Sequence, residues 1–265
     1  MSAFLGQSVF ITGAGQGIGY ALCSAFAQAG AWVGLNDLDP DLAQQATDAI
    51  NVSIGQARVS AVPCDVADTF ALEQAFQGWV AQHGRLDVVI ANAGITDYGT
   101  FLQTTPADFD RVTGVNLRGS YFTAQYAARQ MVAQGRGGRI LLMSSVVGLR
   151  AHRNLTAYGA TKAGIAHMAT LLALELGEHG ITVNALAPGA TLTERTLQDD
   201  PHYAENWASV SMNRRCGTVE DVVNAALFLA SPASGHITAQ TLVVDGGWIG
   251  HSPLATNHPD LPIGR

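Results

Sequence analysis

Short apolar runs rich in β-branched residues alternate along this chain with segments of helical periodicity, and no other feature constrains the fold as strongly. Strands that alternate with helices predict βαβ units, which place the strands in a parallel sheet with right-handed connections. The runs that we predict as strands are residues 8–12, 31–35, 58–62, 86–90, 139–143, 181–185 and 241–244. The sequence therefore predicts an α/β fold whose ligands bind outside the carboxyl ends of the strands.

A glycine-rich turn joins the first predicted strand to a predicted helix over residues 20–29. Its glycines permit a tight turn, close approach of the backbone to a pyrophosphate, and contact between helix and strand. The phosphates would then lie at the helix N-terminus, where free amides and the helix dipole favour anions. Glycine-rich turns also occur in flexible loops, but the strand before this one and the helix after it favour dinucleotide binding. The contacts predicted here are Gly13, Gln16, Gly17, Ile18 and Gly19.

An acidic residue, Asp37, follows the second predicted strand, about 20 residues beyond the glycines. Its carboxylate is placed to accept hydrogen bonds from the adenosine ribose diol and would repel a 2′-phosphate. Leu38, rather than an arginine or lysine, stands beside it, and Gln16 precedes Gly17. These residues favour NAD over NADP as the cofactor, although a plain solvated carboxylate at a strand end is the alternative.

Polar residues and glycines also follow the later strands. Asp65 is placed to accept a hydrogen bond from the adenine amine and Asn92 to brace the loop over the ribose; a helix cap or a turn is the alternative for each. After the sixth strand, proline fixes φ, glycine admits a ligand to the backbone, and threonines offer hydroxyls to a cofactor. The predicted cofactor contacts in these loops are Asp65, Val66, Asn92, Ala93, Gly94, Pro188, Gly189, Thr191 and Thr193.

A tyrosine and a lysine four residues apart, Tyr158 and Lys162, follow the fifth strand and lie in a predicted helix. Residues at this spacing share one helix face, so we expect the ammonium to lower the tyrosine pKa. A tyrosine of this kind exchanges a proton with an alcohol near neutral pH, and a serine at the strand end, Ser144 or Ser145, would bond the same substrate oxygen. Most such pairs merely pack a side-chain stem and expose a charge.

One polar amide, Asn116, lies among apolar residues of a long helical stretch over residues 108–134 that only Gly114 and Gly119 interrupt. On its own it is most simply a buried hydrogen-bonding residue. Residues 190–216 have mixed polarity and precede the next helix, so we predict a lid over the substrate. Residues 250–265 contain three prolines and are predicted to form an irregular tail, and the whole chain, 1–265, to form one domain.

The composition excludes several classes of function. A formal charge of -7 and a pI near 5.5 argue against a nucleic-acid partner. The three cysteines have no metal-ligand spacing and are read as reduced thiols, so no metal is expected. No targeting segment or bilayer-spanning run is recognised, which predicts a cytoplasmic protein without membrane contact. Only 13% of the residues are charged, so part of the surface is predicted to be buried in a homo-oligomer.

Taken together, these motifs resemble the short-chain dehydrogenase/reductase family over residues 7–248. The match comprises the glycines of the first turn, Asp65, Asn92-Ala93-Gly94, Asn116, Ser145, Tyr158-x-x-x-Lys162, Pro188-Gly189 and Asp245-Gly246-Gly247. The resemblance implies a single Rossmann-type, doubly wound domain with a seven-stranded parallel sheet, often assembled as a tetramer. It also implies Ser145 rather than Ser144, because the family serine lies thirteen positions before its tyrosine.

Carried over to this chain, the resemblance implies an NAD-dependent interconversion of a secondary alcohol and a carbonyl. Tyr158 would be the acid/base and Ser145 would hold the substrate oxygen. Lys162 would lower the tyrosine pKa and hold the nicotinamide ribose, and Asn116 would position a water that relays the proton to solvent.

The substrate class is predicted from the loop before Tyr158 and from the lid. The polar residues of these two segments suit a sugar, polyol or similar small hydroxylated molecule. They are Arg150, His152, Arg153, Asn154, Glu194, Arg195, His202, Asn206 and Trp207. The alternative is reduction of a 3-oxoacyl group on a carrier protein, which Arg129, Arg136 and Arg139 would dock, although Asp37 fits NADPH poorly. Large apolar ketones such as steroids come third. A non-catalytic dinucleotide-binding regulator is the alternative from another class, but such proteins tend to lose the tyrosine or lysine.

Overall fold

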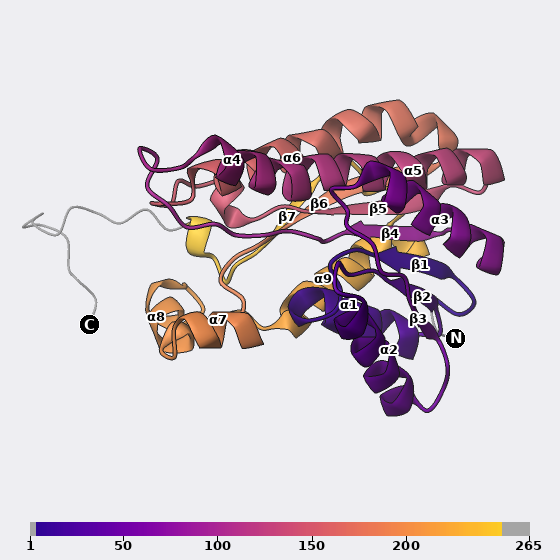
Figure 1. The fold of residues 1–265 in the computed structure, drawn as a ribbon, viewed down its shortest axis with the longest axis horizontal. Coiled ribbons are helices and arrows are strands. Elements are labelled where there is room, and N and C mark those ends of the chain that lie inside the picture. The colour runs from indigo at the N-terminus through magenta and orange to yellow at the C-terminus, as the bar shows by residue number, and fades with distance from the viewer. Residues whose placement is uncertain (1–3, 251–265) are drawn as a thin grey trace, which may run out of the picture.

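Seven parallel strands form one sheet in the computed structural model, which describes residues 4–250 (Figure 1). Their order is β3-β2-β1-β4-β5-β6-β7, and every neighbouring pair is parallel. The strands are β1 (Ser8–Ile11), β2 (Trp32–Leu35), β3 (Val59–Ala61), β4 (Val88–Ala91), β5 (Gly138–Met143), β6 (Ile181–Pro188) and β7 (Thr241–Val244). The predicted α/β class and seven-stranded doubly wound sheet are confirmed.

Helices cover both faces of the sheet (Figure 1). On one face lie α1 (Gly17–Gln28), α2 (Pro40–Ile54) and α9 (Val219–Ala230). On the other lie α3 (Thr69–His83), α4 (Pro106–Thr113), α5 (Gly119–Gln134) and α6 (Thr156–Leu176). Each face therefore has its own apolar core, and the strands between the two are apolar along their length because both sides are covered.

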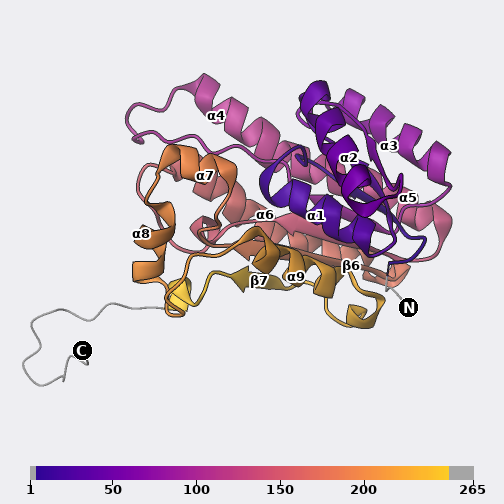
Figure 2. The same ribbon diagram turned by 90° about the horizontal axis from the view of Figure 1, so that it is seen from below.

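Two short helices, α7 (Glu194–Asp199) and α8 (Tyr203–Val210), stand apart from both layers. Both views place them beyond one end of the sheet, where the chain leaves β6 (Figures 1 and 2). They belong to the segment 190–216. Of the predicted tail 250–265, only Gly250 lies within the described residues.

Local signals explain where the helices begin and end. The Asp39 carboxylate accepts hydrogen bonds from the amides of Asp41 and Leu42 at the start of α2, and Pro40 supplies a helix-compatible φ at its first position. Gly55 ends the same helix at φ +66°, a conformation that glycine adopts without strain. The predicted helix of residues 108–134 is instead divided by a π-helical turn, Gly114–Arg118, that carries Asn116.

The middle of β2 has no room for a side chain. A Cβ on Gly34 would lie 2.8 Å from the Phe10 side chain and 3.1 Å from the ring of Trp79, both buried. We predict that Gly34→Ala lowers the free energy of unfolding by about 1–3 kcal/mol through overpacking, measured by urea denaturation. Gly78→Ala is the control, because Gly78 is at an exposed position of α3 where a Cβ would meet nothing within 4 Å. This change should raise the free energy of unfolding by up to about 1 kcal/mol. Equal stability of Gly34→Ala and wild type would contradict this packing.

Candidate active site

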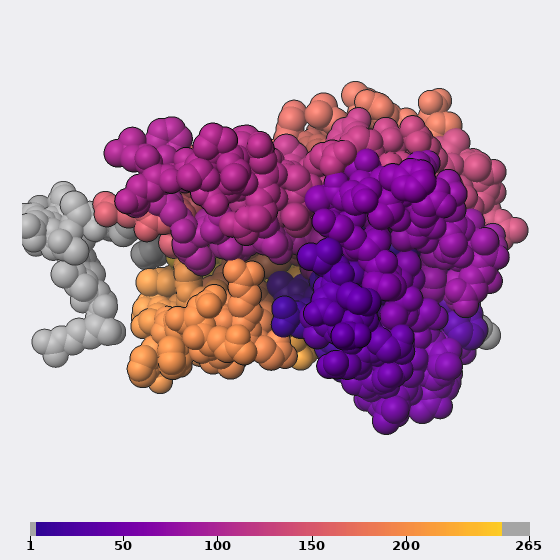
Figure 3. Space-filling model, viewed as in Figure 1, coloured from indigo at the N-terminus to yellow at the C-terminus, as the bar shows by residue number. Residues whose placement is uncertain are grey.

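A cleft of about 510 Å³ lies at the carboxyl ends of the strands. It opens between the segment that carries α7 and α8 and the loop that follows β4, a hollow visible in Figure 3. All the residues predicted to contact a cofactor line this cleft: Gly13, Gln16, Gly17, Ile18, Gly19, Asp37, Asp65, Val66, Asn92, Ala93, Gly94, Tyr158, Lys162, Pro188, Gly189, Thr191 and Thr193. Of the predicted catalytic residues, Asn116 and Ser145 lie behind its wall rather than on its surface.

The glycine turn forms the floor of the cleft and is packed against the loop after β4. Gly13 has φ +60°, and a Cβ there would lie 2.6 Å from Ala93 Cα. A Cβ on Gly19 would lie 2.4 Å from the carbonyl oxygen of Gly13. The Asn92 side-chain amide closes the contact by donating to the carbonyls of Thr12 and Gly13, at 2.9 and 2.8 Å. A backbone surface without side chains, at the start of α1, fits the diphosphate of a dinucleotide.

The acidic side chains of the cleft are held by backbone amides. Asp37 Oδ2 accepts a hydrogen bond from the Gly15 amide at 2.9 Å, which ties the end of β2 to the glycine turn. Asp65 Oδ1 accepts from the Ala67 amide at 2.8 Å, the turn role that its sequence left open. Because both residues also line the cleft, the turn role and a contact with adenosine are compatible.

Lys162, the only lysine among 265 residues, is buried beneath the cleft on α6 with 3% of its surface exposed. Its Nζ donates a hydrogen bond to the Met143 carbonyl at the end of β5, at 2.8 Å, and lies 5.5 Å from the centroid of the Tyr158 ring. Burial lowers the pKa of Lys162 to about 8, because the charged form loses its hydration.

The pKa of Tyr158 moves in the direction opposite to the sequence-based prediction. Burial of the phenol raises the pKa, and the Tyr98 phenol adds to this, whereas hydrogen bonding to Ser145 and Thr96 and the charge of Arg195 lower it. The predicted lowering by Lys162 was therefore wrong for this structure. The ammonium is directed at a backbone carbonyl, and burial outweighs the groups that favour the phenolate.

The two candidate serines have different partners. Ser144 lines the cleft, and its Oγ donates to the Lys162 carbonyl at 2.7 Å. Ser145 Oγ accepts from the Val147 amide at 3.2 Å, and the same hydroxyl lowers the pKa of the Tyr158 phenol. Asn116 is fully buried, and its side chain pairs with Ile95: Oδ1 accepts from the amide at 2.8 Å and Nδ2 donates to the carbonyl at 3.0 Å. This pairing holds the loop after β4 beside the phenol and the ammonium.

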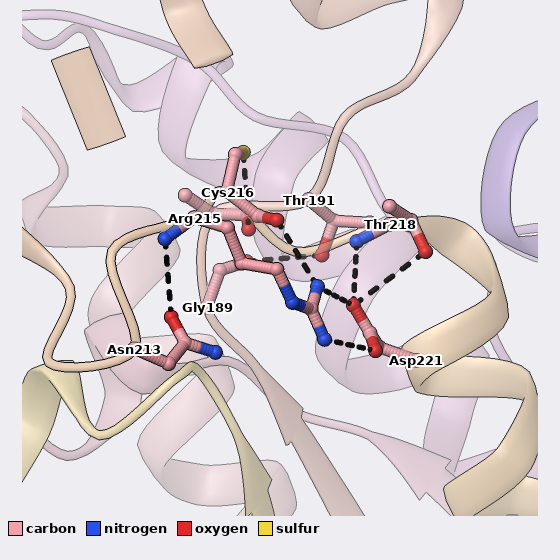
Figure 4. A network of polar contacts seen from close by, with 8 residues as sticks. Gly189, Thr191, Asn213, Arg215, Cys216, Thr218 and Asp221 are labelled. Carbon is pink, nitrogen blue, oxygen red and sulfur yellow. Dashed lines mark hydrogen bonds and ion pairs between the residues drawn. The ribbon is translucent and has the colours of Figure 1, made fainter. Parts of the chain in front are cut away.

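The segment 190–216 begins and ends at the same place. Thr191 and Gly217 form a β-bridge, so the two ends of the segment meet beside β6. Figure 4 shows how the second end is fastened: Arg215 and Asp221 form a two-bonded ion pair, with Nη2 to Oδ1 at 2.7 Å, and Asp221 accepts from the Thr218 amide at 2.9 Å. The Arg215 guanidinium accordingly lowers the pKa of Asp221 to about 2.

The polar residues predicted to face the substrate divide into two groups. Glu194 and Arg195 line the cleft, whereas the other seven do not. His202 and Asn206 hydrogen-bond to Asp200 within the segment, and Arg150 donates to the Ile249 carbonyl. Trp207 packs against the rings of His152 and Tyr203, and Arg153 and Asn154 lie in the same loop as His152. Sequence reasoning missed other residues of the wall: Thr96, Tyr98 and Tyr203 bring hydroxyls to the cleft, and Cys64, Met143 and Thr196 also line it. Only Thr96 carried a signal, its position directly after the Asn92-Ala93-Gly94-Ile95 loop.

Two negative observations apply to the described residues, 4–250. No helix in that range combines the length and the apolarity needed to cross a bilayer. The same range contains no group of three or more histidine, cysteine or acidic side chains placed to hold a metal ion.

Comparison with known proteins now identifies the family. Residues 13–249 match the model of a family described as enoyl-(acyl carrier protein) reductase, a group of short-chain dehydrogenases. This chain belongs to the short-chain dehydrogenase/reductase family. As a member, it is an NAD(P)-dependent oxidoreductase that acts on CH–OH groups.

Relatives within the short-chain dehydrogenase/reductase family differ in their substrates. An L-rhamnose 1-dehydrogenase (NAD(P)⁺) of Sphingomonas sp. is 38% identical over 93% of this chain and 98% of its own length. A sorbitol dehydrogenase of Cereibacter sphaeroides is 34% identical over 91% of this chain and 97% of its own length. A 3-oxoacyl-[acyl-carrier-protein] reductase of Chlamydia trachomatis is 33% identical over 91% of this chain and 96% of its own length. A 7α-hydroxysteroid dehydrogenase of Escherichia coli is 35% identical over 92% of this chain and 94% of its own length.

A solved structure extends the likeness to the fold. A gluconate 5-dehydrogenase from Burkholderia cenocepacia, solved in complex with NADP and tartrate, superimposes with a TM-score of 0.87. It is 32% identical to this chain and covers 95% of it and 98% of its own length.

Because Lys162 is the only lysine, its titration can be measured directly. We predict that the single ¹³Cε signal of the folded, lysine-labelled protein titrates near pH 8, and that the urea-unfolded protein titrates near pH ~10.4. Between these values the unfolded state binds more protons, so this group makes the free energy of unfolding rise with pH. A folded-state titration near that of free lysine would show that the ammonium is hydrated rather than buried.

Proposed function

We propose that this protein is an NAD-dependent oxidoreductase that interconverts a secondary alcohol and a carbonyl on a sugar, polyol or similar small hydroxylated substrate. The observation that carries the proposal is that Tyr158 and Lys162 line the same cleft as Asp37, with the Ser145 hydroxyl buried beside the phenol. The glycine turn of this cleft has the shape and free amides that a diphosphate requires.

In this proposal Tyr158 transfers the proton of the reaction and Ser145 donates a hydrogen bond to the substrate oxygen. The glycine turn and Lys162 would hold the dinucleotide, whose nicotinamide carbon would accept or return the hydride. Because burial raises the pKa of Tyr158, the free protein holds a neutral phenol, the form that protonates a carbonyl. Carbonyl reduction should therefore run at neutral pH, and alcohol oxidation should speed up as the pH rises.

Lys162 and Asn116 act behind the phenol. We propose that Lys162 holds the nicotinamide ribose hydroxyls and that Asn116 positions a water that links this ammonium to solvent. Supporting this, Lys162 Nζ and Asn116 Oδ1 approach the same point beside Gly94, at 3.2 and 3.4 Å from where a Cβ would lie. A glycine at this position leaves room for both groups beneath the loop after β4.

The substrate class rests on the hydroxyl-bearing wall and on the relatives. Thr96, Tyr98 and Tyr203 line the substrate end of the cleft with Tyr158, and such groups suit a polyhydroxylated molecule. Relatives named as dehydrogenases of L-rhamnose, sorbitol and gluconate support the same class.

The 3-oxoacyl carrier-protein alternative has relatives in its favour, but the positions of two of its predicted docking arginines do not support it. Arg139 lies at the start of β5, at the edge of the sheet opposite to the cleft, and donates to the Ser231 carbonyl at 3.5 Å. Arg129 lies 3.9 Å from Glu73 of α3 and over the Tyr126 ring. The predicted patch of Arg129, Arg136 and Arg139 therefore does not border the cleft.

We also propose that the chain is one domain, that residues 190–216 are a lid, and that the protein is a homo-oligomer, most simply a tetramer. The bridge between Thr191 and Gly217 leaves the lid attached at a narrow base, which suits movement over the cleft. Exposed apolar side chains on α5 and α6, such as Val132, Leu171 and Leu174, support burial against another copy.

Replacing the proposed acid/base tests the reaction. We predict that Tyr158→Phe lowers kcat by about 10²–10⁴-fold while NADH still binds, measured by steady-state kinetics and NADH fluorescence. Tyr121→Phe, at an exposed position of α5, is the control and should keep wild-type kinetics. Near-normal turnover by Tyr158→Phe would remove Tyr158 from the chemistry.

Cofactor preference tests the role of Asp37. We predict that kcat/KM for NAD exceeds that for NADP by at least about tenfold, because the carboxylate repels a 2′-phosphate. Asp37→Asn should narrow this ratio mainly by improving NADP, since its amide oxygen can still accept from Gly15. Asp41→Asn, at the exposed first turn of α2, should leave the ratio unchanged. A wild-type preference for NADP would contradict the assignment.

A further inference from the structure

Thr96 is the point at which the lid meets the opposite wall of the cleft. From the lid helix α7, Arg195 Nη2 donates a hydrogen bond to the Thr96 carbonyl at 3.3 Å, across 99 residues of sequence. The nearest acid to this guanidinium is Asp199 on the same helix, 3.8 Å from Nε and exposed. The contact with Thr96 is thus the hydrogen bond by which Arg195 joins α7 to the loop after β4.

The side chain of the same residue faces the catalytic end. The Thr96 hydroxyl lies close enough to the Tyr158 phenol to lower its pKa, as the Ser145 hydroxyl does. Thr96 lines the cleft together with Tyr158 and Arg195, so all three border the space in which a substrate oxygen would lie. The Thr96 backbone therefore bonds to the lid helix α7, and its side chain lies beside the phenol in the cleft.

Thr96 is held in place by its two neighbours. Asn116 binds the amide and carbonyl of Ile95 at 2.8 and 3.0 Å, and Arg111 Nη2 forms an ion pair with Asp97 Oδ2 at 2.5 Å. The Thr96 side chain is half-exposed rather than part of either apolar core. A packing role therefore does not account for its position, whereas a rigid support for a hydroxyl does.

We propose that Thr96 is a positioning residue that orients the hydroxyl of Tyr158, and that Arg195 closes the lid onto the same residue, so that lid closure and orientation of the phenol are coupled. The inference rests on the proposed role of Tyr158 as acid/base. It assigns the loop after β4 a part in proton transfer in addition to its contact with the dinucleotide.

The groups around Tyr158 set the direction of the expected effect. Tyr98 from the β4–α4 loop raises the pKa of Tyr158, and Arg195 from α7 lowers it. Lys162 of α6 lies 5.5 Å from its ring, and the phenol of Tyr203 in α8 interacts with it electrostatically. Loss of the Thr96 hydroxyl or of the Arg195 charge removes a group that favours the phenolate. Both changes should move the pH dependence of alcohol oxidation toward higher pH.

The test uses two pairs of variants, Thr96→Val with its control Thr96→Ser, and Arg195→Gln with its control Arg214→Gln. For each variant, kcat and kcat/KM for alcohol oxidation are measured across pH at saturating NAD. Thr96→Val should lower kcat by about three- to tenfold, the value of one hydrogen bond, and shift the profile to higher pH, whereas Thr96→Ser should restore both. Arg195→Gln should shift the profile in the same direction and raise the substrate KM. Arg214→Gln, a lid residue that contacts Ser209, should match wild type.

Three outcomes would overturn the proposal. A wild-type pH profile for Thr96→Val would show that the Thr96 hydroxyl does not orient the phenol. A Thr96→Ser variant as impaired as Thr96→Val would show that the methyl group of Thr96 matters instead of its hydroxyl. An Arg195→Gln profile equal to wild type would exclude the coupling to the lid. NADH titration of each variant shows that the cleft is intact. An inactive Tyr158→Phe beside a wild-type-like Thr96→Val would reject this inference alone, whereas an active Tyr158→Phe would reject the proposed function itself.

Discussion

Close contact between the glycine turn after β1 and the loop after β4 is the constraint on which the rest of the structure depends. A Cβ at Gly13 would overlap Ala93, and the Asn92 amide spans the same contact with two hydrogen bonds. The two loops come from neighbouring strands of the sheet, so the right-handed parallel order brings them together. The turn can therefore present bare backbone to an anion only because β4 supports it from behind.

The catalytic end of the cleft depends on burial. Lys162 is the only lysine of the chain, and it lies beneath the cleft, bonded to the Met143 carbonyl. The same burial lowers the pKa of this ammonium and raises that of Tyr158, so both groups are biased toward their neutral forms. The hydroxyls of Ser145 and Thr96 and the Arg195 guanidinium of α7, rather than the ammonium one turn away, are the groups that oppose this bias at the phenol. The charges of the site are thus set by the loop after β4 and by α7 as well as by α6.

The fold was predictable because its signals are local. Each strand is a short apolar run, and the glycine turn follows directly on the first one, so element order and sheet type could be inferred without tertiary information. The lining of the cleft was also predictable, because parallel strands bring their carboxyl ends to one edge and the motifs follow those ends.

The sequence could not predict how deeply the site residues are buried or which residues from distant segments contact one another. Helical spacing placed Lys162 beside Tyr158 correctly, but the spacing says nothing of desolvation, which reverses the pKa prediction. The contact between Arg195 and Thr96 spans 99 residues and has no signature in either segment. The arginines proposed to dock a carrier protein were linked only by charge, and the start of β5 carries Arg139 away from the cleft. Each failure concerns how elements pack, not which elements form.

The central claim is that one cleft holds the dinucleotide with its reactive ring beside Tyr158, and a crystal structure of the complex with NAD tests this most directly. We expect the diphosphate on the glycine turn, the adenosine ribose at Asp37, and the nicotinamide C4 separated from the Tyr158 hydroxyl by no more than one substrate oxygen. A nicotinamide ring bound outside this end of the cleft, or a Tyr158 hydroxyl directed away from it, would contradict the account.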